Sequence, residues 1–236
     1  MRRYSVFFVV FPFVLIFIRL GIWQVDRLHQ RRALNAALTG NRDLPAVDLS
    51  NTPPDELPRF RRITANGFFD FDHQVVVDAR EFEGVPSVVL VTPLRMPAGK
   101  AVLVERGSAL SLDAHTLDPA KFAENDSATV SGLVVLEPGP PGQPPAVPGP
   151  WPPHVQWLNP ARLAPLFPYE ILPYVIRRQE RPASAPRGLI PVPVPELDDG
   201  PHLSYALQWF SFAIIAAVGS VALFKKGEEG RGKGEE

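Results

Sequence analysis

Two stretches of sequence decide the fold: YSVFFVVFPFVLIFIRLGIW at Tyr4–Trp23 and YALQWFSFAIIAAVGSVALF at Tyr205–Phe224. At about 1.5 Å per residue, either stretch is long enough to cross a hydrocarbon core of roughly 30 Å. The second stretch carries no charge. The first carries only Arg19, which lies about a turn from the end of the stretch and can extend its guanidinium to the membrane interface. The sequence therefore predicts two transmembrane helices, at residues 4–23 and 203–224.

The first stretch also has one feature of a cleavable signal peptide, because Arg2 and Arg3 give it a basic start. Its apolar part is longer than that of a typical signal peptide. It is followed by WQVDRLHQRR, residues 23–32, rather than by a small-residue cleavage site. We therefore expect an uncleaved anchor.

The charges that flank the second stretch favour one orientation in the membrane. Lysines and arginines follow it in residues 225–236, whereas Glu196, Asp198 and Asp199 precede it, and basic flanks stay in the cytoplasm. Arginines lie on both sides of the first stretch, so they do not decide its direction. With two spans, we expect both termini in the cytoplasm and the central domain outside it.

Composition excludes several kinds of partner. The net charge of −1 and the lack of a basic face with interleaved aromatic residues give no basis for nucleic-acid binding. The chain has no cysteine, which rules out disulfides and thiolate metal sites. Cu(I) prefers Cys and Met ligands, and the only methionines are Met1 and Met96, so a copper chaperone is disfavoured.

The central part reads as a β-rich domain at residues 59–180, preceded by a neck at 24–58 and followed by a linker at 181–201 and a cytoplasmic tail at 225–236. The neck begins with a helix-like continuation of the first span. Runs rich in Val, Ile and Phe, separated by turn residues, predict strands at 59–69, 73–80, 87–94, 101–106, 128–136 and 171–179. Because the gaps leave little room for crossover helices, we expect an antiparallel sheet or small barrel, and a membrane α+β fold class.

Two features interrupt the strand pattern. Residues 137–153 contain nine prolines, which predicts an extended loop. This loop is either a tolerated surface insertion, the interpretation we favour, or a polyproline ligand for a partner. Asn159-Pro160 supplies an N-cap and a proline at the first helical position, so we expect a short helix through Leu166.

No signature of an enzyme is present. The chain has no nucleophile elbow, phosphate-binding loop, dinucleotide fingerprint or zinc-protease motif. Asp70, Asp72 and His73 are close in sequence, but they fall in an expected hairpin turn, where aspartate is favoured for its local backbone hydrogen bonds. We expect no catalytic residues and no enzymatic activity.

The opening of the second span, PHLSYALQWF, carries the richest signal. At helical spacing, His202, Tyr205 and Trp209 share one face. Tyr and Trp are ordinary residues of the membrane interface, whereas a histidine there is less ordinary. Two interpretations remain open: an interfacial histidine, or a neutral imidazole that ligates haem iron beside aromatic rings.

Other faces of the same span predict helix packing. Ser204, Gln208 and Ser211 form a polar stripe, which we expect to pack against the first helix or a partner. The pairs Ala213/Ala217 and Ala216/Ser220 are small residues four apart, a spacing that permits close contact between helices.

Four motifs in order resemble the surfeit locus protein 1 family of membrane proteins, which assist assembly of cytochrome c oxidase. They are LGIWQVDR at Leu20–Arg27, VTPL at Val91–Leu94, VLVERG at Val102–Gly107 and HLSYALQWFSFA at His202–Ala213. The chain departs from the family pattern after Gly107, where residues 108–110 are Ser-Ala-Leu in place of the family's Trp and Val-Pro.

The resemblance implies a role in delivering or stabilising haem a in the catalytic subunit of the oxidase. It implies that His202 is the candidate haem a ligand, with Tyr205 and Trp209 beside it, and that the partners are the catalytic subunit, the haem a supply machinery and the bilayer. We accordingly expect a multi-pass protein of the bacterial inner membrane. Two rivals remain: a membrane-anchored periplasmic binding or scaffold protein not involved with haem, and an anchored hydrolase.

Overall fold

The computed structural model describes residues 2–50, 56–135, 139, 142, 146–147, 149–183 and 185–232. The chain forms two compact units, residues 1–37 with 196–236, and residues 38–195. About half of the predicted proline-rich loop at 137–153 and the end of the predicted tail lie outside the described residues. Each unit is described by itself below.

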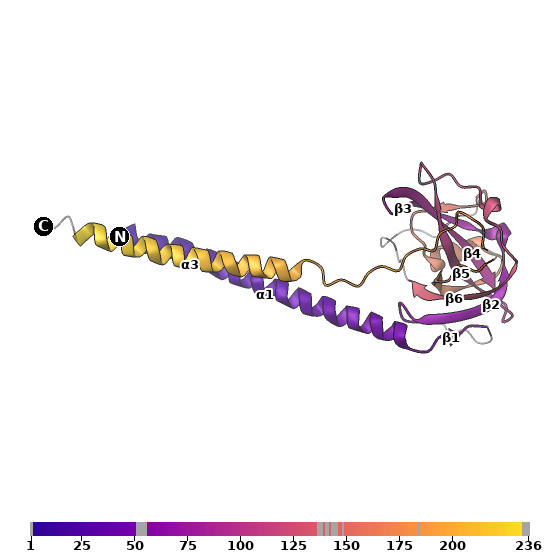
Figure 1. The fold of residues 1–236 in the computed structure, drawn as a ribbon, viewed down its shortest axis with the longest axis horizontal. Helices are drawn as coiled ribbons and strands as arrows, with labels where there is room; N and C mark the ends of the chain where they lie inside the picture. Colours follow the sequence, from indigo (N-terminus) through magenta and orange to yellow (C-terminus); the bar gives the residue numbers. More distant parts are fainter. Residues whose placement is uncertain are drawn as a thin grey trace. The chain divides into compact units, whose positions relative to one another are not determined.

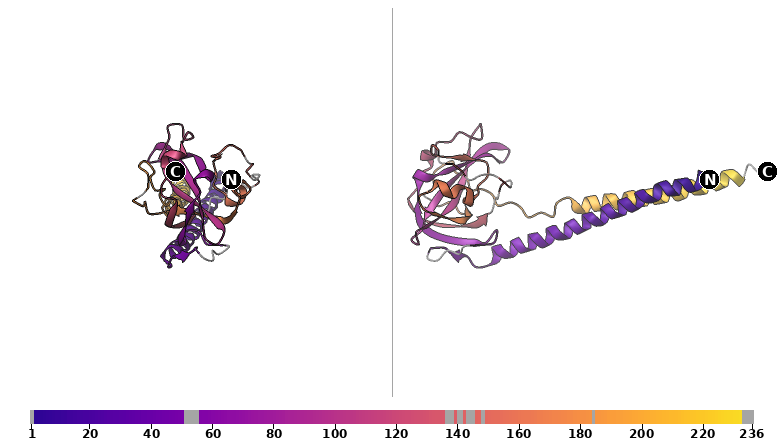
Figure 2. Two further views of the ribbon diagram at one scale, coloured as in Figure 1. Left: turned by 90° about the vertical axis from the view of Figure 1, so that its right-hand side faces the viewer. Right: turned by 180° about the vertical axis from the view of Figure 1, so that it is seen from behind.

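The first unit is a pair of helices, α1 (Arg2–Asp43) and α3 (His202–Gly232). The two helices lie side by side and run in opposite directions in Figure 1, and again from behind in Figure 2. Both are long and apolar enough to cross a membrane, by length and composition. With 42 residues, α1 is about 63 Å long, so it continues well past its apolar part, as its sequence predicts.

The two helices meet along a seam of small and polar residues. Buried positions recur seven residues apart, at Ala206, Ala213 and Ser220 of α3 and at Gly21 and Leu28 of α1. This period is that of a coiled coil, in which facing side chains interlock. The ring of Phe210 fills the space where Gly21 lacks a side chain, because an ideal Cβ on Gly21 would lie 2.5 Å from it. Small residues therefore allow the close helix contact that the alanine spacing predicts.

The second unit is built on an eight-stranded sheet. The strands are β1 (Val47–Asp48), β2 (Arg62–Phe69), β3 (Val75–Phe82), β4 (Val85–Arg95), β5 (Lys100–Leu110), β6 (Ser127–Val135), β7 (His154–Val155) and β8 (Glu170–Arg178). Their order is β1-β2-β6-β8-β5-β4-β3-β7, and β2 also pairs with β4. The extra pairing joins β2, β6, β8, β5 and β4 into a closed ring, which is the small barrel that the strand pattern allowed (Figure 1).

Alternate residues of the ring strands fill its interior. This follows from strand geometry, because every second side chain points to the same face. The interior residues from the five ring strands are Ile63, Ala65, Phe69, Leu94, Val102, Val104, Val130, Val134, Leu172, Tyr174 and Ile176. Most of them are completely buried, so the ring encloses a packed core rather than a channel.

The expectation of an antiparallel sheet was wrong in part, because the sheet is mixed. Strand β8 pairs with β5 in parallel, from Lys100↔Glu170 to Glu105↔Arg177, and with β6 antiparallel. The chain leaves β6, makes a long connection and returns as β8, which lies between β6 and β5 and is antiparallel to the first and parallel to the second. Two-residue strands β1 and β7 add further parallel pairs, with β2 and β3.

The short helix predicted at Asn159-Pro160 is confirmed. Helix α2 spans Pro160–Leu163 and continues as the 3-10 turn η3, Ala164–Leu166. The Asn159 side chain accepts a hydrogen bond from the backbone N–H of Arg162, and Pro160 occupies the first turn. Two further 3-10 turns, η1 (Phe71–His73) and η2 (Pro119–Phe122), are each preceded by an aspartate that caps them in the same way.

Candidate functional site

His202 is the first residue of α3, and its ring is fixed by a partner on α1. Its Nδ1 lies 2.8 Å from Oε1 of Gln24, and the Gln24 side chain belongs to the buried seam. An amide oxygen only accepts hydrogen bonds, so Nδ1 carries the proton in this pair. In a neutral imidazole with this hydrogen bond, the other ring nitrogen, Nε2, has a lone pair, and a neutral imidazole nitrogen is the form of histidine that binds metal ions.

The space beside Nε2 is kept open by a glycine. An ideal Cβ on Gly200 would lie 3.5 Å from Cδ2 and 3.6 Å from Nε2 of His202. Gly200 has φ of 67°, a left-handed conformation that favours glycine over every other residue. Gly200 in the backbone turn before α3 therefore places no side chain against Nε2 of His202.

Of the two aromatic residues predicted beside His202, one lies on the seam and one faces outward. Trp209 stacks on Phe17 of α1, with ring centroids 5.8 Å apart and planes 23° apart, and also contacts Phe212 edge-on. Tyr205 is 47% exposed. Trp209 therefore joins α3 to α1, whereas Tyr205 presents a free aromatic surface one turn below His202.

The polar stripe of Ser204, Gln208 and Ser211 does not pack against α1, and the first alternative predicted for it was wrong. All three residues are exposed. Ser204 donates to the Pro201 carbonyl and Ser211 to the Leu207 carbonyl, both at 2.8 Å. Because each hydroxyl is satisfied within its own helix, neither needs a neighbouring helix.

The segment that leads into α3 is tied to α1 by polar contacts. Arg32 pairs with Asp199 at 2.8 Å, and Arg31 lies 3.7 Å from Asp198. The Asn35 amide donates to the Asp198 backbone carbonyl at 2.8 Å. The ion pairs are exposed and individually weak, but together they fix the turn that carries Gly200 and His202.

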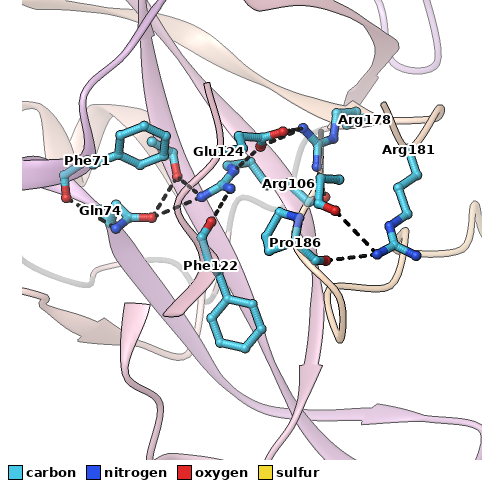
Figure 3. A network of polar contacts seen from close by, with 10 residues as sticks. Phe71, Gln74, Arg106, Phe122, Glu124, Arg178, Arg181 and Pro186 are labelled. Carbon is cyan, nitrogen blue, oxygen red and sulfur yellow. Dashed lines mark hydrogen bonds and ion pairs between the residues drawn. The ribbon is translucent and has the colours of Figure 1, made fainter. Parts of the chain in front are cut away.

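A buried network of charges lies in the β unit, around Arg106 (Figure 3). Arg106 Nε donates to Glu124 at 2.6 Å, and Arg178 Nη1 donates to the same carboxylate at 2.8 and 3.1 Å. The Arg106 and Glu124 side chains are 0% and 3% exposed. The remaining Arg106 donors reach Gln74, Thr92 and the Phe122 carbonyl.

The electrostatics of this network follow from its burial. Removal from water lowers the pKa of Arg106, the nearby Glu124 carboxylate raises it, and Arg178 lowers it further, with a net downward direction. The guanidinium also lies over the rings of Phe69 and Phe71, at 5.4 and 5.1 Å. Nearly every polar atom has a partner within the fold, which is the arrangement of a structural network.

The turn predicted from Asp70, Asp72 and His73 is present as η1, but it is not a hairpin turn, because β2 and β3 do not pair with each other. Asp70 caps η1 by accepting from the Asp72 backbone N–H, and it also contacts His73 Nδ1 at 2.9 Å and the Tyr169 hydroxyl at 2.8 Å. Partial burial raises the pKa of Asp70, but the hydrogen bonds from His73 and Tyr169 outweigh it and hold the pKa below its usual value. Burial, then the Asp70 hydrogen bond, raise the pKa of Tyr169 well above its usual value.

Asp70 and Asp78, two aspartates before and within β3, make contacts with different partners. Asp70 bonds His73 and Tyr169, whereas Asp78 bonds His115 and His154, from the loop after β5 and from β7. The two histidines have no motif spacing and lie far from Asp78 in the sequence. The grouping of Asp78 with His115 and His154 is therefore visible only in the folded structure.

Known proteins resemble the chain over most of its length. Uncharacterised SURF1-like proteins of Mycobacterium bovis and Mycobacterium tuberculosis are each 29% identical over 211 residues, which cover 87% of this chain and 76% of the relative. A SURF1-like protein of Rickettsia bellii is 32% identical over 98 residues, 39% of each chain. The sequence model of the SURF1 family matches residues 11–214, so the chain belongs to the SURF1 family.

Proposed function

We propose that this protein is an assembly factor for cytochrome c oxidase that delivers or stabilises haem a in the catalytic subunit. Membership of the SURF1 family, a family of oxidase assembly factors, supports the first part of this proposal. The single observation that supports the haem part is the His202–Gln24 pair, which leaves Nε2 of His202 with a free lone pair beside an unobstructed glycine turn.

The residues near His202 suit a flat, apolar cargo. His202 supplies one axial nitrogen, Gln24 holds the ring by its other nitrogen, and Tyr205 offers an exposed aromatic face one turn away. Because His202 is the one histidine at this turn of the described helical unit, this protein would hold a haem iron by a single ligand. A single protein ligand is appropriate for a cargo that has to be released.

In this proposal α1 and α3 span the bacterial inner membrane, with both termini in the cytoplasm and residues 38–195 outside. The basic residues after α3 and the acidic residues before it support the orientation. The oxidase catalytic subunit and the haem a supply machinery are the proposed partners, and the exposed face of α3 with Ser204, Gln208 and Ser211 is available to them.

Deletion of the gene tests the function. We expect the deletion strain to lose most of the haem a absorbance of its membranes and most of its oxidase activity, and to regain both when the wild-type gene is supplied. Reduced-minus-oxidised spectra of membranes measure haem a directly. Unchanged haem a content in the deletion strain would exclude the proposal and favour the rival scaffold protein.

The ligand assignment has its own test. Purified His202→Ala protein should carry less than about a tenth of the haem a that co-purifies with the wild type, because the axial nitrogen is lost. Gln24→Leu keeps the imidazole but frees its ring, so its haem affinity should fall by about 10-fold. Tyr205→Phe is the matched control and should retain haem a. Full occupancy in His202→Ala would remove His202 from the mechanism while leaving the assembly role intact.

A further inference from the structure

The folded chain brings one carboxylate and two imidazoles together at an edge of the sheet. His115 Nδ1 lies 2.7 Å from Asp78 Oδ2, and His154 Nδ1 lies 2.8 Å from Asp78 Oδ1. The two imidazole centroids are 4.2 Å apart. One ligand atom from each of the three residues lies within 4.8 Å of the others. Small side-chain movements would bring these three atoms to the spacing of ligands on one metal ion.

Irregular backbone positions two of these side chains. Asp78 immediately follows Val77 at a bulge in the β3–β4 pairing, and Ala79 inside the bulge has φ of 53°. Ala114, just before His115, has φ of 51°, and its carbonyl accepts from the Ala79 N–H at 2.9 Å. Bulges re-aim side chains, and left-handed alanines store strain, so this backbone bond holds Asp78 and His115 toward each other.

The third side chain is positioned by the parallel pairing of β7 with β3. His154 is the register partner of Val76, and the Val76 N–H donates to the Pro153 carbonyl at 3.1 Å. Asp113 fixes the other loop by accepting from the N–H groups of His115 and Thr116. Three separate segments, β3, β7 and the loop after β5, therefore each place one side chain in this group.

We propose that Asp78, His115 and His154 bind a divalent transition-metal ion of the Zn²⁺ class. Two imidazoles and one carboxylate form a set of three protein ligands that suits Zn²⁺ and leaves a further coordination position open. Soft Cu(I) prefers sulfur ligands, whereas Ca²⁺ and Mg²⁺ prefer oxygen ligands alone. The two nitrogen donors and one oxygen donor of this group therefore disfavour all three ions. When both imidazoles are neutral, the ion supplies the positive counter-charge for the Asp78 carboxylate.

The geometry requires only a small adjustment on binding. Ligand atoms about 2.0–2.1 Å from a tetrahedral ion lie about 3.3 Å apart, somewhat more than the present Nδ1–Oδ distances. The side chain of His115 is 59% exposed and that of His154 is 26% exposed, so both can move outward. Each Nδ1 gives up its proton to Nε2 or to water and then faces the ion. The exposed side leaves the open position to a water molecule or a partner's ligand.

Zinc titration of the full-length protein in detergent, carrying no polyhistidine tag, tests the proposal. Isothermal titration calorimetry should detect one Zn²⁺ per chain with micromolar or tighter affinity. Co²⁺ should give a visible absorption band of a low-coordinate site. The double variant His115→Ala/His154→Ala should lower the Zn²⁺ affinity by at least about 100-fold. Absence of binding at 100-fold molar excess of Zn²⁺ would overturn the proposal.

Matched variants separate this site from the other histidines. His29→Ala on an exposed position of α1 and His202→Ala on α3 should each keep the wild-type Zn²⁺ affinity. Loss of binding in His202→Ala alone would place the ion there and contradict the assignment. His115 is the most exposed of the three ligands, so the single variant His115→Ala should fold normally. It should weaken Zn²⁺ binding by at least 10-fold. Binding equal to wild type in that variant would also contradict it.

Discussion

Replacing Glu124 with Gln is expected to lower the free energy of unfolding by about 3–5 kcal/mol, because it leaves two buried guanidiniums without their shared counter-charge. Glu124 is the carboxylate that both Arg106 and Arg178 contact, and arginine does not lose its proton in a protein. For a chain of this length the melting temperature should fall by about 6–20 °C. Thermal unfolding of the full-length protein in detergent, followed by circular dichroism, measures the change.

Glu170→Gln is the matched control for this substitution. Glu170 also pairs with a cation, Lys100 at 2.7 Å. Because the Glu170 side chain is 62% exposed, water solvates the Lys100 ammonium group once the carboxylate is removed. We expect a loss below about 1 kcal/mol. Equal, small losses in the two variants would mean that water reaches Arg106, contrary to the buried network.

The second large effect is expected at Gly67, where β2 changes its partner. Gly67 is in register with Ala128 of β6, and the next two residues pair with Arg95 and Leu94 of β4. An ideal Cβ on Gly67 would overlap the Arg95 carbonyl oxygen and lie 3.0 Å from the carbonyl carbon. Gly67→Ala should therefore separate β2 from β4, open the ring and lower the free energy of unfolding by about 2–3 kcal/mol.

Hydrogen exchange localises this effect. The Asp70 N–H donates to the Pro93 carbonyl at 2.9 Å across the same closure, and it should exchange faster in Gly67→Ala. Gly40→Ala is the control, because no atom lies within 4 Å of an added Cβ there and alanine favours the helix of α1. That variant should be equally or more stable than the wild type. A Gly67→Ala protein as stable as Gly40→Ala would show that the ring does not depend on this contact.

The fold was predictable where the signal is local. The apolar runs, the Asn159-Pro160 cap and the Val-rich strands each follow from neighbouring residues, and the structure contains a helix or strand at each of them. The direction of β8 was not predictable. Its run, Ile171–Gln179, reads as a strand in either direction, and its place between β5 and β6 depends on the path of a long connection.

The packing of α3 was only partly predictable. The small residues Ala213 and Ser220 lie on the seam as their spacing predicts, but the serine stripe does not. A serine in a helix can bond a carbonyl of its own preceding turn, so its polarity alone does not require a neighbour. The partner of His202 was not predicted either, because Gln24 lies on the other helix, 178 positions away.

The same limit applies to the buried charges. Arg106 belongs to the VLVERG motif that supports the family resemblance. Its partner Glu124 lies 18 positions from it along the chain, and Arg178, which contacts the same carboxylate, lies 54 positions from Glu124. Glu105, the preceding residue of the motif, forms a second buried ion pair, with Arg177. The motif therefore contributes Arg106 and Glu105 to two buried ion pairs of the β unit.

The antiparallel seam also imposes an order on the protein's biogenesis. About 160 residues separate the end of α1 from His202, and at roughly 5–20 residues per second the ribosome needs roughly 8–30 s to make them. Small β domains fold in milliseconds to seconds. The last strand of the β ring ends at Arg178, so the whole ring is synthesised before α3. Gln24 is without its partner on α3 throughout that interval, and its contact with His202 can form only after the β unit has been synthesised.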